Sequence, residues 1–156
     1  MLSCRPLDFA RGKSWGLIVA VLATIVGCRA QAPEKPQTKA IGGAAIAWNY
    51  DYADGMAKAR EAGKPVMVDV FSSTCLPCKI LDETVFSRAD VVEASKAFVT
   101  VRVDGDKNPD TTRKLRVSGY PTVLFLTPEG QEIGRSLGAV PYQDMLDSMA
   151  RARGRG

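Results

Sequence analysis

Two cysteines stand close together near the middle of the chain, in the tetrapeptide Cys75-Leu76-Pro77-Cys78. The tetrapeptide follows an apolar run over residues 65–71 and precedes a segment of helix-forming residues. This order predicts that Cys75 begins a helix, where unpaired backbone N–H groups and the helix dipole favour the thiolate over the thiol. The thiolate is the nucleophilic form of cysteine. Because Cys78 follows one helical turn later, the two sulfurs can close a disulfide and exchange two electrons with the disulfide of another protein.

Two other interpretations of the cysteine pair compete with redox chemistry. A tetrahedral zinc site needs four ligands, usually from two pairs. The chain has no histidine, and its remaining cysteines, Cys4 and Cys28, lie in a segment with the features of an export signal. A purely structural disulfide between Cys75 and Cys78 would constrain the unfolded chain little, because the loop is so short. We therefore expect no bound metal and no separate cofactor, and we expect the Cys75–Cys78 disulfide itself to be the redox group.

The N-terminal segment predicts export. Three basic residues precede an uncharged, mostly apolar run of thirteen residues, Trp15–Gly27. That length is typical of a signal peptide and short for a membrane span. The run ends in Ile25-Val26-Gly27-Cys28. This sequence resembles the bacterial lipobox, which implies that Cys28 becomes the lipid-modified first residue of the mature protein. An ordinary secretory signal and an uncleaved anchor are the alternatives, and all three place the domain outside the cytoplasm.

Composition divides the chain into three parts. Residues 1–27 form the predicted lipoprotein signal peptide, residues 28–47 a flexible tether, and residues 48–156 a folded domain. The tether contains prolines and glycines but few large apolar residues, so it cannot build a core. An extra strand at Ala44–Trp48 remains an alternative for its end. The formal net charge is +4. Outside the predicted signal peptide and the basic C-terminal tail, basic residues alternate with acidic ones, which does not favour nucleic-acid binding.

The domain alternates helical and strand patterns, which predicts an α/β protein with a mixed central sheet and helices on both faces. In the first half of the domain we expect a helix over 52–62 ended by Gly63, a strand over 65–71, a helix from Cys75 to Glu83, and a short helix over 91–94 capped by Ser87 or Asp90. A strand over 98–103, a helix over 110–115, a strand over 122–126 and an antiparallel edge strand over 131–136 should follow. The last helix should turn an apolar stripe towards the core, formed by Tyr142, Met145, Leu146, Met149 and Ala150.

Over roughly residues 48–150, the chain resembles the thioredoxin family. The resemblance rests on the strand–CxxC–helix join, on Asp69 six residues before Cys75, and on Gly119-Tyr120-Pro121-Thr122 before the next strand. Within the family, the tract from residue 64 to residue 79 is most similar to the C-terminal thioredoxin-like domain of the membrane reductase DsbD and its small exported relatives. Thr74 stands where thioredoxins usually have Trp, and Leu76 replaces their Gly. The resemblance implies the thioredoxin fold.

The chemistry and the resemblance together assign roles to three residues. Cys75 is the expected attacking nucleophile, and Cys78, expected to be buried with its pKa raised by desolvation, resolves the mixed disulfide. Asp69 is a carboxylic acid in a strand that otherwise has a buried pattern, so its pKa should rise. Such a carboxyl can accept the proton of Cys78 and return it, the role thought to belong to the matching family position. The alternative is a structural ion pair of Asp69 with Arg102.

The dipeptide Tyr120-Pro121 resembles the cis-proline loop that faces the CxxC motif in the family. The resemblance implies that the Tyr120 backbone pairs with an extended substrate segment, a short β-augmentation. We place Leu76 and Pro77, which border the reactive sulfur, in the same substrate-binding set. A trans proline that starts an edge strand is the alternative.

These observations predict an exported, membrane-tethered thiol–disulfide oxidoreductase on the periplasmic side of a bacterial cell envelope, acting as a monomeric reductant. Its expected clients are oxidised periplasmic proteins, including cytochrome c maturation components, and its electrons would come from a membrane thiol reductase. A disulfide oxidase or isomerase would use the same cysteines, and the direction depends on redox potential. A third hypothesis is a lipoprotein that binds a partner or Cu(I) without turnover, since two thiolates suit Cu(I).

Overall fold

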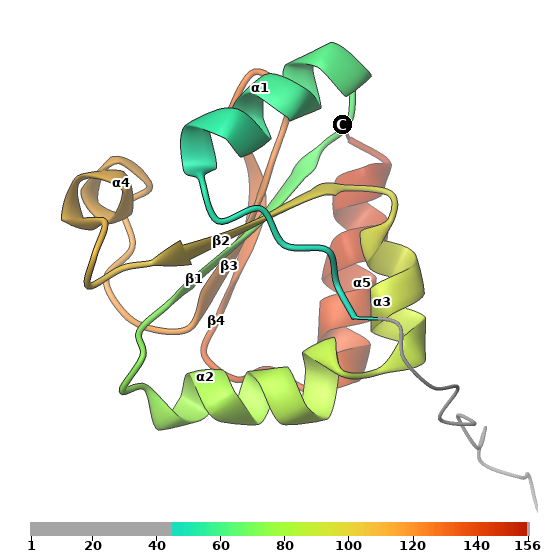
Figure 1. The fold of residues 1–156 in the computed structure, drawn as a ribbon. Coiled ribbons are helices and arrows are strands. Elements are labelled where there is room, and N and C mark those ends of the chain that lie inside the picture. Colours follow the sequence, from blue (N-terminus) through green and yellow to red (C-terminus); the bar gives the residue numbers. More distant parts are fainter. Residues whose placement is uncertain (1–44, 156) are drawn as a thin grey trace, which may run out of the picture. The chain divides into compact units, whose positions relative to one another are not determined.

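A mixed four-stranded sheet forms the centre of the part of the chain that the structure describes (Figure 1). The computed structural model describes residues 45–155; Cys28, the predicted signal peptide and most of the predicted tether lie outside them. The strands are arranged in the order β2-β1-β3-β4. Strand β1 is parallel to β2 and antiparallel to β3, and β4 is an antiparallel edge strand beside β3. The strands are β1 (Val66–Phe71), β2 (Val99–Asp104), β3 (Thr122–Leu126) and β4 (Glu132–Leu137).

Helices cover both faces of the sheet, as predicted. Helices α2, α3 and α5 pack on one face, where α3 and α5 lie side by side in Figure 1, and helix α1 packs on the other, with the end of α4 beside it. A π-helical turn, η1, continues α2 without a break. The bounds are α1 (Tyr52–Ala62), α2 (Leu76–Leu81), η1 (Asp82–Phe86), α3 (Ala89–Ser95), α4 (Pro109–Lys114) and α5 (Tyr142–Arg153).

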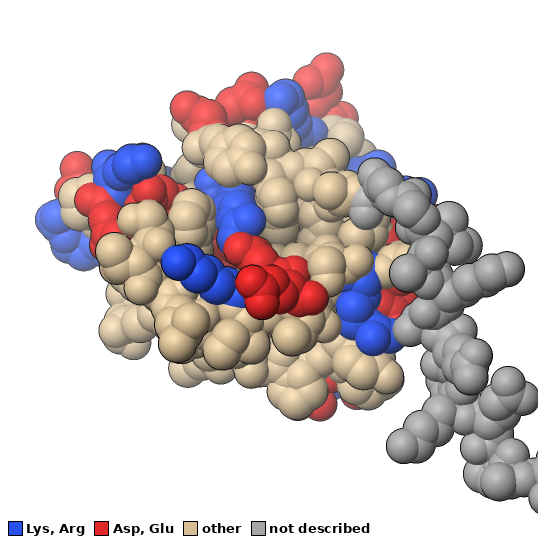
Figure 2. All heavy atoms as spheres, turned by 60° about the horizontal axis from the view of Figure 1, so that its bottom comes forward, with Lys and Arg blue, Asp and Glu red and all other residues tan. Residues whose placement is uncertain are grey.

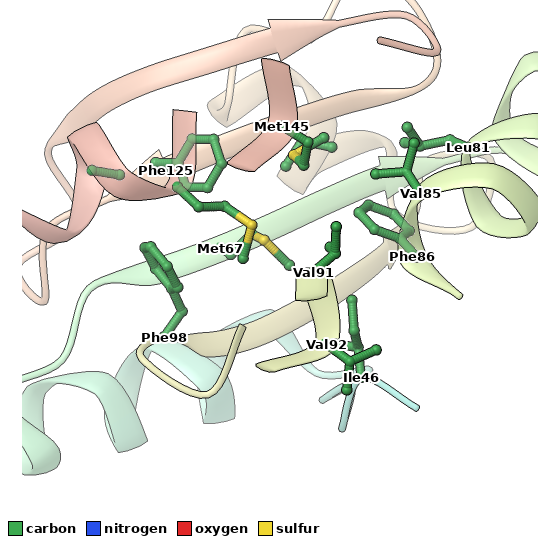
Figure 3. Packing of buried hydrophobic residues seen from close by; sticks show 13 residues of the cluster. Ile46, Met67, Leu81, Val85, Phe86, Val91, Val92, Phe98, Phe125 and Met145 are labelled. Atoms are coloured by element: carbon green, nitrogen blue, oxygen red, sulfur yellow. The ribbon is translucent and has the colours of Figure 1, made fainter. Parts of the chain in front are cut away.

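Strand β1 contributes to two separate cores because its side chains alternate between the faces of the sheet. Val66, Val68 and Val70 point towards α1, whereas Met67 points towards α3 and α5. Figure 3 shows Met67 among aromatic and aliphatic side chains from the other elements of that core, and it shows Ile46 next to Val92. Burial on both faces explains why the strand is a nearly continuous apolar run and makes Asp69, its one charged residue, conspicuous.

The ends of two helices test the predicted caps. Helix α1 begins where the Asp51 side chain accepts the Asp54 N–H at 2.8 Å, and it ends at Gly63, whose φ of 60° is left-handed as a glycine C-cap allows. The predicted cap of α3 was wrong. The N-cap is Arg88, because the chain leaves the π-helical turn only at Ser87, and Asp90 lies inside the first turn, where its carboxylate accepts the Val91 N–H.

The predicted apolar stripe of α5 is only partly buried. Met145 and Met149 are in the core and Leu146 is half-buried against it, but Tyr142 and Ala150 are exposed. Tyr142 instead lies under the guanidinium of Arg88, whose Cζ is 3.6 Å from the ring centroid. The edge of the stripe is therefore a surface cation–π contact.

The segment before α1 runs along the edge of β2. The alternative strand over residues 44–48 is not present in the described part, residues 45–48; instead, a single parallel bridge joins Asn49 to Val101. The Asn49 N–H donates to the Thr100 carbonyl at 2.9 Å, and the Asn49 carbonyl accepts from the Arg102 N–H at 2.7 Å. Among the helices of residues 45–155, none combines the length and apolar character needed to cross a membrane.

The close packing of α1 on β2 gives a test of the fold. A Cβ added at Gly55 would collide with Cγ2 of Val101, which is fully buried. We expect Gly55→Ala to lower the free energy of unfolding by about 1–2 kcal/mol, because so close a contact puts the cost of overpacking at about 2–3 kcal/mol, against roughly 1 kcal/mol gained in helix propensity. Urea unfolding measures the change. Gly154→Ala is the control, since its new Cβ would meet only ordinary contacts, at 3.8 and 3.9 Å. Equal stability of the two variants would contradict the packing.

Candidate active site

The two cysteines lie where β1 passes into α2, as the sequence predicts, and they form a disulfide with their Cα atoms 5.3 Å apart. The turn between strand and helix is closed by a hydrogen bond from the Cys75 N–H to the Ser72 carbonyl, at 3.2 Å. Cys75 is the N-cap of α2, and its sulfur accepts the Cys78 N–H at 3.1 Å. A backbone donor is thus already aimed at the sulfur on which negative charge develops when the disulfide is reduced, and it stabilises the thiolate.

The two sulfurs differ in access. Cys75 is half-buried, whereas Cys78 is only 3% exposed. Leu76 and Pro77, between them, are exposed, and Leu76 is 67% exposed. An incoming disulfide can therefore reach Cys75 and would meet Leu76 and Pro77 beside it, while Cys78 is shielded from direct attack.

Asp69 lies in the middle of β1 and is 1% exposed. Burial raises the pKa of its carboxyl from 3.8 to about 7; the positive charge of Arg102 opposes the rise and the negative charge of Asp82 adds to it. The Nε of Arg102 is 3.1 Å from Oδ2 of Asp69, but among the described residues neither Nε nor Oδ1 of Asp69 has an aligned hydrogen-bond partner. The ion pair that was the alternative for Asp69 exists, yet a pKa of about 7 leaves the carboxyl about half protonated at pH 7.

The guanidinium of Arg102 makes its hydrogen bonds to Asp82, which lies in the helical segment after Cys78. Its Nη2 lies 2.7 and 2.8 Å from the two carboxylate oxygens of Asp82, which follows Cys78 by one helical turn. The guanidinium also packs on the Phe71 ring, with its Cζ 4.5 Å from the centroid. Arg102 therefore joins the strand that carries Asp69 to the helix that carries Cys78. Asp69 receives the attraction of the cation without a strong hydrogen bond to it.

A hollow of about 260 Å³ opens beside α2 and is lined in part by Cys78, Lys79, Asp82 and Arg102. Figure 2 views the molecule from the side of α2, and basic and acidic side chains gather near the middle of this face with uncharged residues around them. The hollow gives water a path towards the side of α2 that carries the buried cysteine. Within residues 45–155, no group of three or more His, Cys, Asp or Glu side chains is arranged to hold a metal ion.

The proline loop lies at the same end of the sheet as the cysteines. The Tyr120–Pro121 peptide bond is cis. Thr122, the next residue, pairs with Val70 of β1, whose chain then leads to Cys75. The Pro121 carbonyl accepts the Gly138 N–H at 2.8 Å, and Leu137, opposite Thr122, is 62% exposed. Leu137 therefore presents an exposed apolar side chain next to this loop.

Sequence reasoning missed three contributors to the site. The sequence could have indicated Asp82, because a residue four positions after Cys78 lies on the same face of the helix. Ser72 and Asp106 had no such indication, since their hydrogen bond joins loops that are 34 residues apart in the chain. Only the fold brings them together.

Comparison with known proteins gives the family. The thioredoxin-like family model matches residues 47–128, which is more than half of the chain. The chain belongs to the thioredoxin-like family. With its CxxC pair it is a thiol–disulfide oxidoreductase of the thioredoxin fold.

Individual relatives cover different shares of the chain. The thiol:disulfide interchange protein DsbD of Klebsiella pneumoniae is 40% identical over 80 residues, 49% of this chain and only 13% of DsbD. Thioredoxin 1 of Chlorobaculum tepidum is 34% identical over 95 residues, 61% of this chain and 91% of that protein. The solution structure of a thioredoxin from Thermus thermophilus aligns with a TM-score of 0.62 and 31% identity over 69% of this chain and 86% of that one. The match to DsbD is thus to a small part of a much longer protein.

The raised pKa of Asp69 makes stability depend on pH. A carboxyl with a pKa of 3.8 unfolded and about 7 folded stabilises the protein fully below pH 3.8, and this stabilisation is lost as the pH rises to about 7. The difference in unfolding free energy, Asp69→Asn minus wild type, should therefore rise between about pH 4 and 7 by on the order of 2–4 kcal/mol and then level off.

Urea unfolding at a series of pH values measures this difference. Asp147→Asn is the control, because Asp147 is exposed on α5 and the variant should follow the wild-type curve. A difference between Asp69→Asn and wild type that stays constant from pH 4 to 8 would show that Asp69 is an ordinary charged partner of Arg102.

Proposed function

We propose that this thioredoxin-like protein is exported, tethered to the membrane through Cys28, and reduces disulfides of proteins on the periplasmic side of a bacterial cell envelope. The observation that carries the thiol–disulfide exchange is the unequal access of the two sulfurs, with Cys75 half-buried at the start of α2 and Cys78 buried behind it. The reducing direction is the part of the proposal that the redox potential tests. A reductant that releases its product needs one sulfur for attack and a protected second sulfur for resolution.

The reaction follows from this arrangement. The Cys75 thiolate attacks one sulfur of a client disulfide, the client S–S bond breaks, and one client thiolate leaves. The Cys78 thiol then loses its proton and attacks the Cys75 sulfur. This second step releases the other client thiolate and closes the Cys75–Cys78 disulfide, so that two electrons have passed to the client.

Asp69 is suited to receive the proton of Cys78. Its pKa of about 7 allows it to exchange protons at neutral pH, and Arg102 links the strand that carries it to the helix that carries Cys78. The hollow beside Cys78 and Arg102 supplies a path by which water can relay and exchange the proton.

The predicted substrate surface surrounds Cys75. Leu76 and Pro77 border the sulfur, and the Tyr120–Pro121 loop lies at the same end of the sheet. In the proposal, the backbone of Tyr120 pairs with an extended client segment, and the exposed Leu76 and Leu137 contact its side chains.

Electrons must return to the protein after each turnover. The similarity to part of DsbD, a protein named for thiol:disulfide interchange, supports a membrane thiol reductase as the donor, whose dithiol would reduce the Cys75–Cys78 disulfide. The apolar run ending in Ile25-Val26-Gly27-Cys28 supports export and lipid attachment. We expect the protein to act as a monomer, since a single thioredoxin-like domain carries the whole CxxC site.

Cysteine variants test the assignment of attack to Cys75 and of resolution to Cys78. Cys75→Ser should abolish reduction of insulin disulfides, because the attacking sulfur is gone. Cys78→Ser should retain attack and accumulate a mixed disulfide with the client, because resolution is lost. Non-reducing electrophoresis and mass spectrometry detect the trapped species. Turnover by the Cys75 variant, or trapping through Cys78, would contradict the assignment.

The redox potential of the wild-type protein tests the direction of electron flow. Equilibration of the wild type with reduced and oxidised glutathione should give a potential close to that of thioredoxin, about −270 mV. A value near that of the oxidant DsbA, about −120 mV, would replace the reductase by a disulfide oxidase.

Lipid attachment at Cys28 is tested in a bacterial host. The wild-type chain should fractionate with membranes and carry a lipid-modified N-terminal Cys28. Cys28→Ala should block the modification and normal processing, because no thiol remains to accept the lipid. Several acyl chains hold a soluble domain on a membrane at about 0.8 kcal/mol per buried methylene. A mature wild-type protein with an unmodified N-terminus at another residue would refute the tether.

A further inference from the structure

The loop after β2 contacts the loop that carries the nucleophile. The Ser72 hydroxyl donates to Oδ2 of Asp106 at 2.6 Å, and Ser72 is buried. Because its proton is used there, the Ser72 oxygen accepts the hydroxyl of Thr74 at 3.2 Å and the Thr74 N–H at 3.4 Å. The Ser72 carbonyl accepts the Cys75 N–H. Ser72 therefore makes the hydrogen bonds that order the turn before Cys75, and its own hydroxyl is oriented by Asp106.

The neighbouring residue, Gly105, contacts the proline loop. A Cβ at Gly105 would collide with the Tyr120 hydroxyl and lie 2.5 and 2.6 Å from Cζ and Cε1 of the same ring. The Tyr120 ring thus rests on the bare backbone of Gly105, directly before the cis peptide bond to Pro121. Gly105 is also tied to the nucleophile's strand, because its N–H donates to the Phe71 carbonyl at 2.7 Å.

We propose that the dipeptide Gly105-Asp106 is a positioning element that sets the Cys75 turn and the Tyr120–Pro121 loop relative to each other. Asp106 orients the nucleophile through Ser72, and Gly105 sets the client-binding loop through Tyr120. The inference rests on the proposed reduction of protein disulfides, in which Cys75 attacks a disulfide that the Tyr120–Pro121 loop has bound.

The two contacts should have separable effects on catalysis. Loss of the Ser72–Asp106 hydrogen bond frees the turn before Cys75, so attack should slow for every disulfide, large or small. A methyl group at Gly105 displaces Tyr120 but leaves the Ser72 hydrogen bonds in place. It should weaken binding of a protein client and leave attack on a small disulfide unchanged.

The experiment uses the full chain in its reduced form with two substrates, oxidised glutathione and insulin. We expect Ser72→Ala and Asp106→Ala each to slow the reduction of both substrates by about tenfold, a size typical of lost orientation. The double variant should be no slower than either single one, because the two residues act as one unit. Asp106→Asn should retain most of the wild-type rate, since the amide oxygen still accepts the Ser72 hydroxyl.

We expect Gly105→Ala to raise KM for insulin by about tenfold while the rate with oxidised glutathione stays within about twofold of wild type. If this variant folds poorly, Gly105→Ala combined with Tyr120→Leu removes the ring that the new methyl meets, and its KM should match that of Tyr120→Leu alone. The controls are Asp110→Ala, whose exposed carboxylate pairs with Arg113, and Gly134→Ala, whose new Cβ would meet nothing within 4 Å among the described residues. Both controls should match the wild type.

Three results would overturn the inference. The reduction rate of the Ser72→Ala/Asp106→Ala double variant could fall by the product of the two single effects, or Gly105→Ala could impair the reduction of insulin and of oxidised glutathione equally. The third result is a set of variants that lose stability while their reduction rates stay at the wild-type value. A wild type that reduces neither substrate would instead refute the proposed function.

Discussion

The ionic contact of Arg102 with two carboxylates is the constraint on which the active site depends. Asp82 takes both strong hydrogen bonds of the guanidinium, and buried Asp69 receives only its charge. A cation that paired fully with Asp69 would hold the pKa of that carboxyl low and remove it from proton transfer at neutral pH. Division of the arginine between strand and helix therefore keeps Asp69 able to exchange a proton, and it also fixes α2 on the sheet.

Much of this arrangement was predictable from local pattern. Strand β3 was predicted at its observed bounds, and β1 within one residue, because alternating or continuous apolar residues give a strong strand signal. The cysteine pair at the start of a helix followed from the same reasoning, since a strand followed directly by CxxC leaves little freedom. Asp69 stood out because a carboxylic acid interrupts a buried strand, and Arg102 was identified as its possible partner from strand adjacency alone.

The remainder depended on contacts that local pattern does not encode. The π-helical turn over Asp82–Phe86 delays the end of the helix, which is why the cap of α3 was misplaced at Ser87 or Asp90. The bond between Arg102 and Asp82 required the distance between β2 and α2 to be known. The Ser72–Asp106 bond required two loops to be folded against each other. Such side-chain contacts over long sequence separations are set by the whole fold, so local sequence pattern does not predict which residues meet.

The departures from usual thioredoxin residues acquire a physical meaning in this structure. Thr74, in place of Trp, presents a hydroxyl and an N–H to the Ser72 oxygen, so a small polar residue belongs to the hydrogen-bonded turn before Cys75. Leu76, in place of Gly, adds an exposed apolar side chain beside the reactive sulfur. The ion pair of Asp69 with Arg102 involves neither of these residues. Because both alter the turn and the surface around Cys75, we expect their main effect on which disulfides the protein binds.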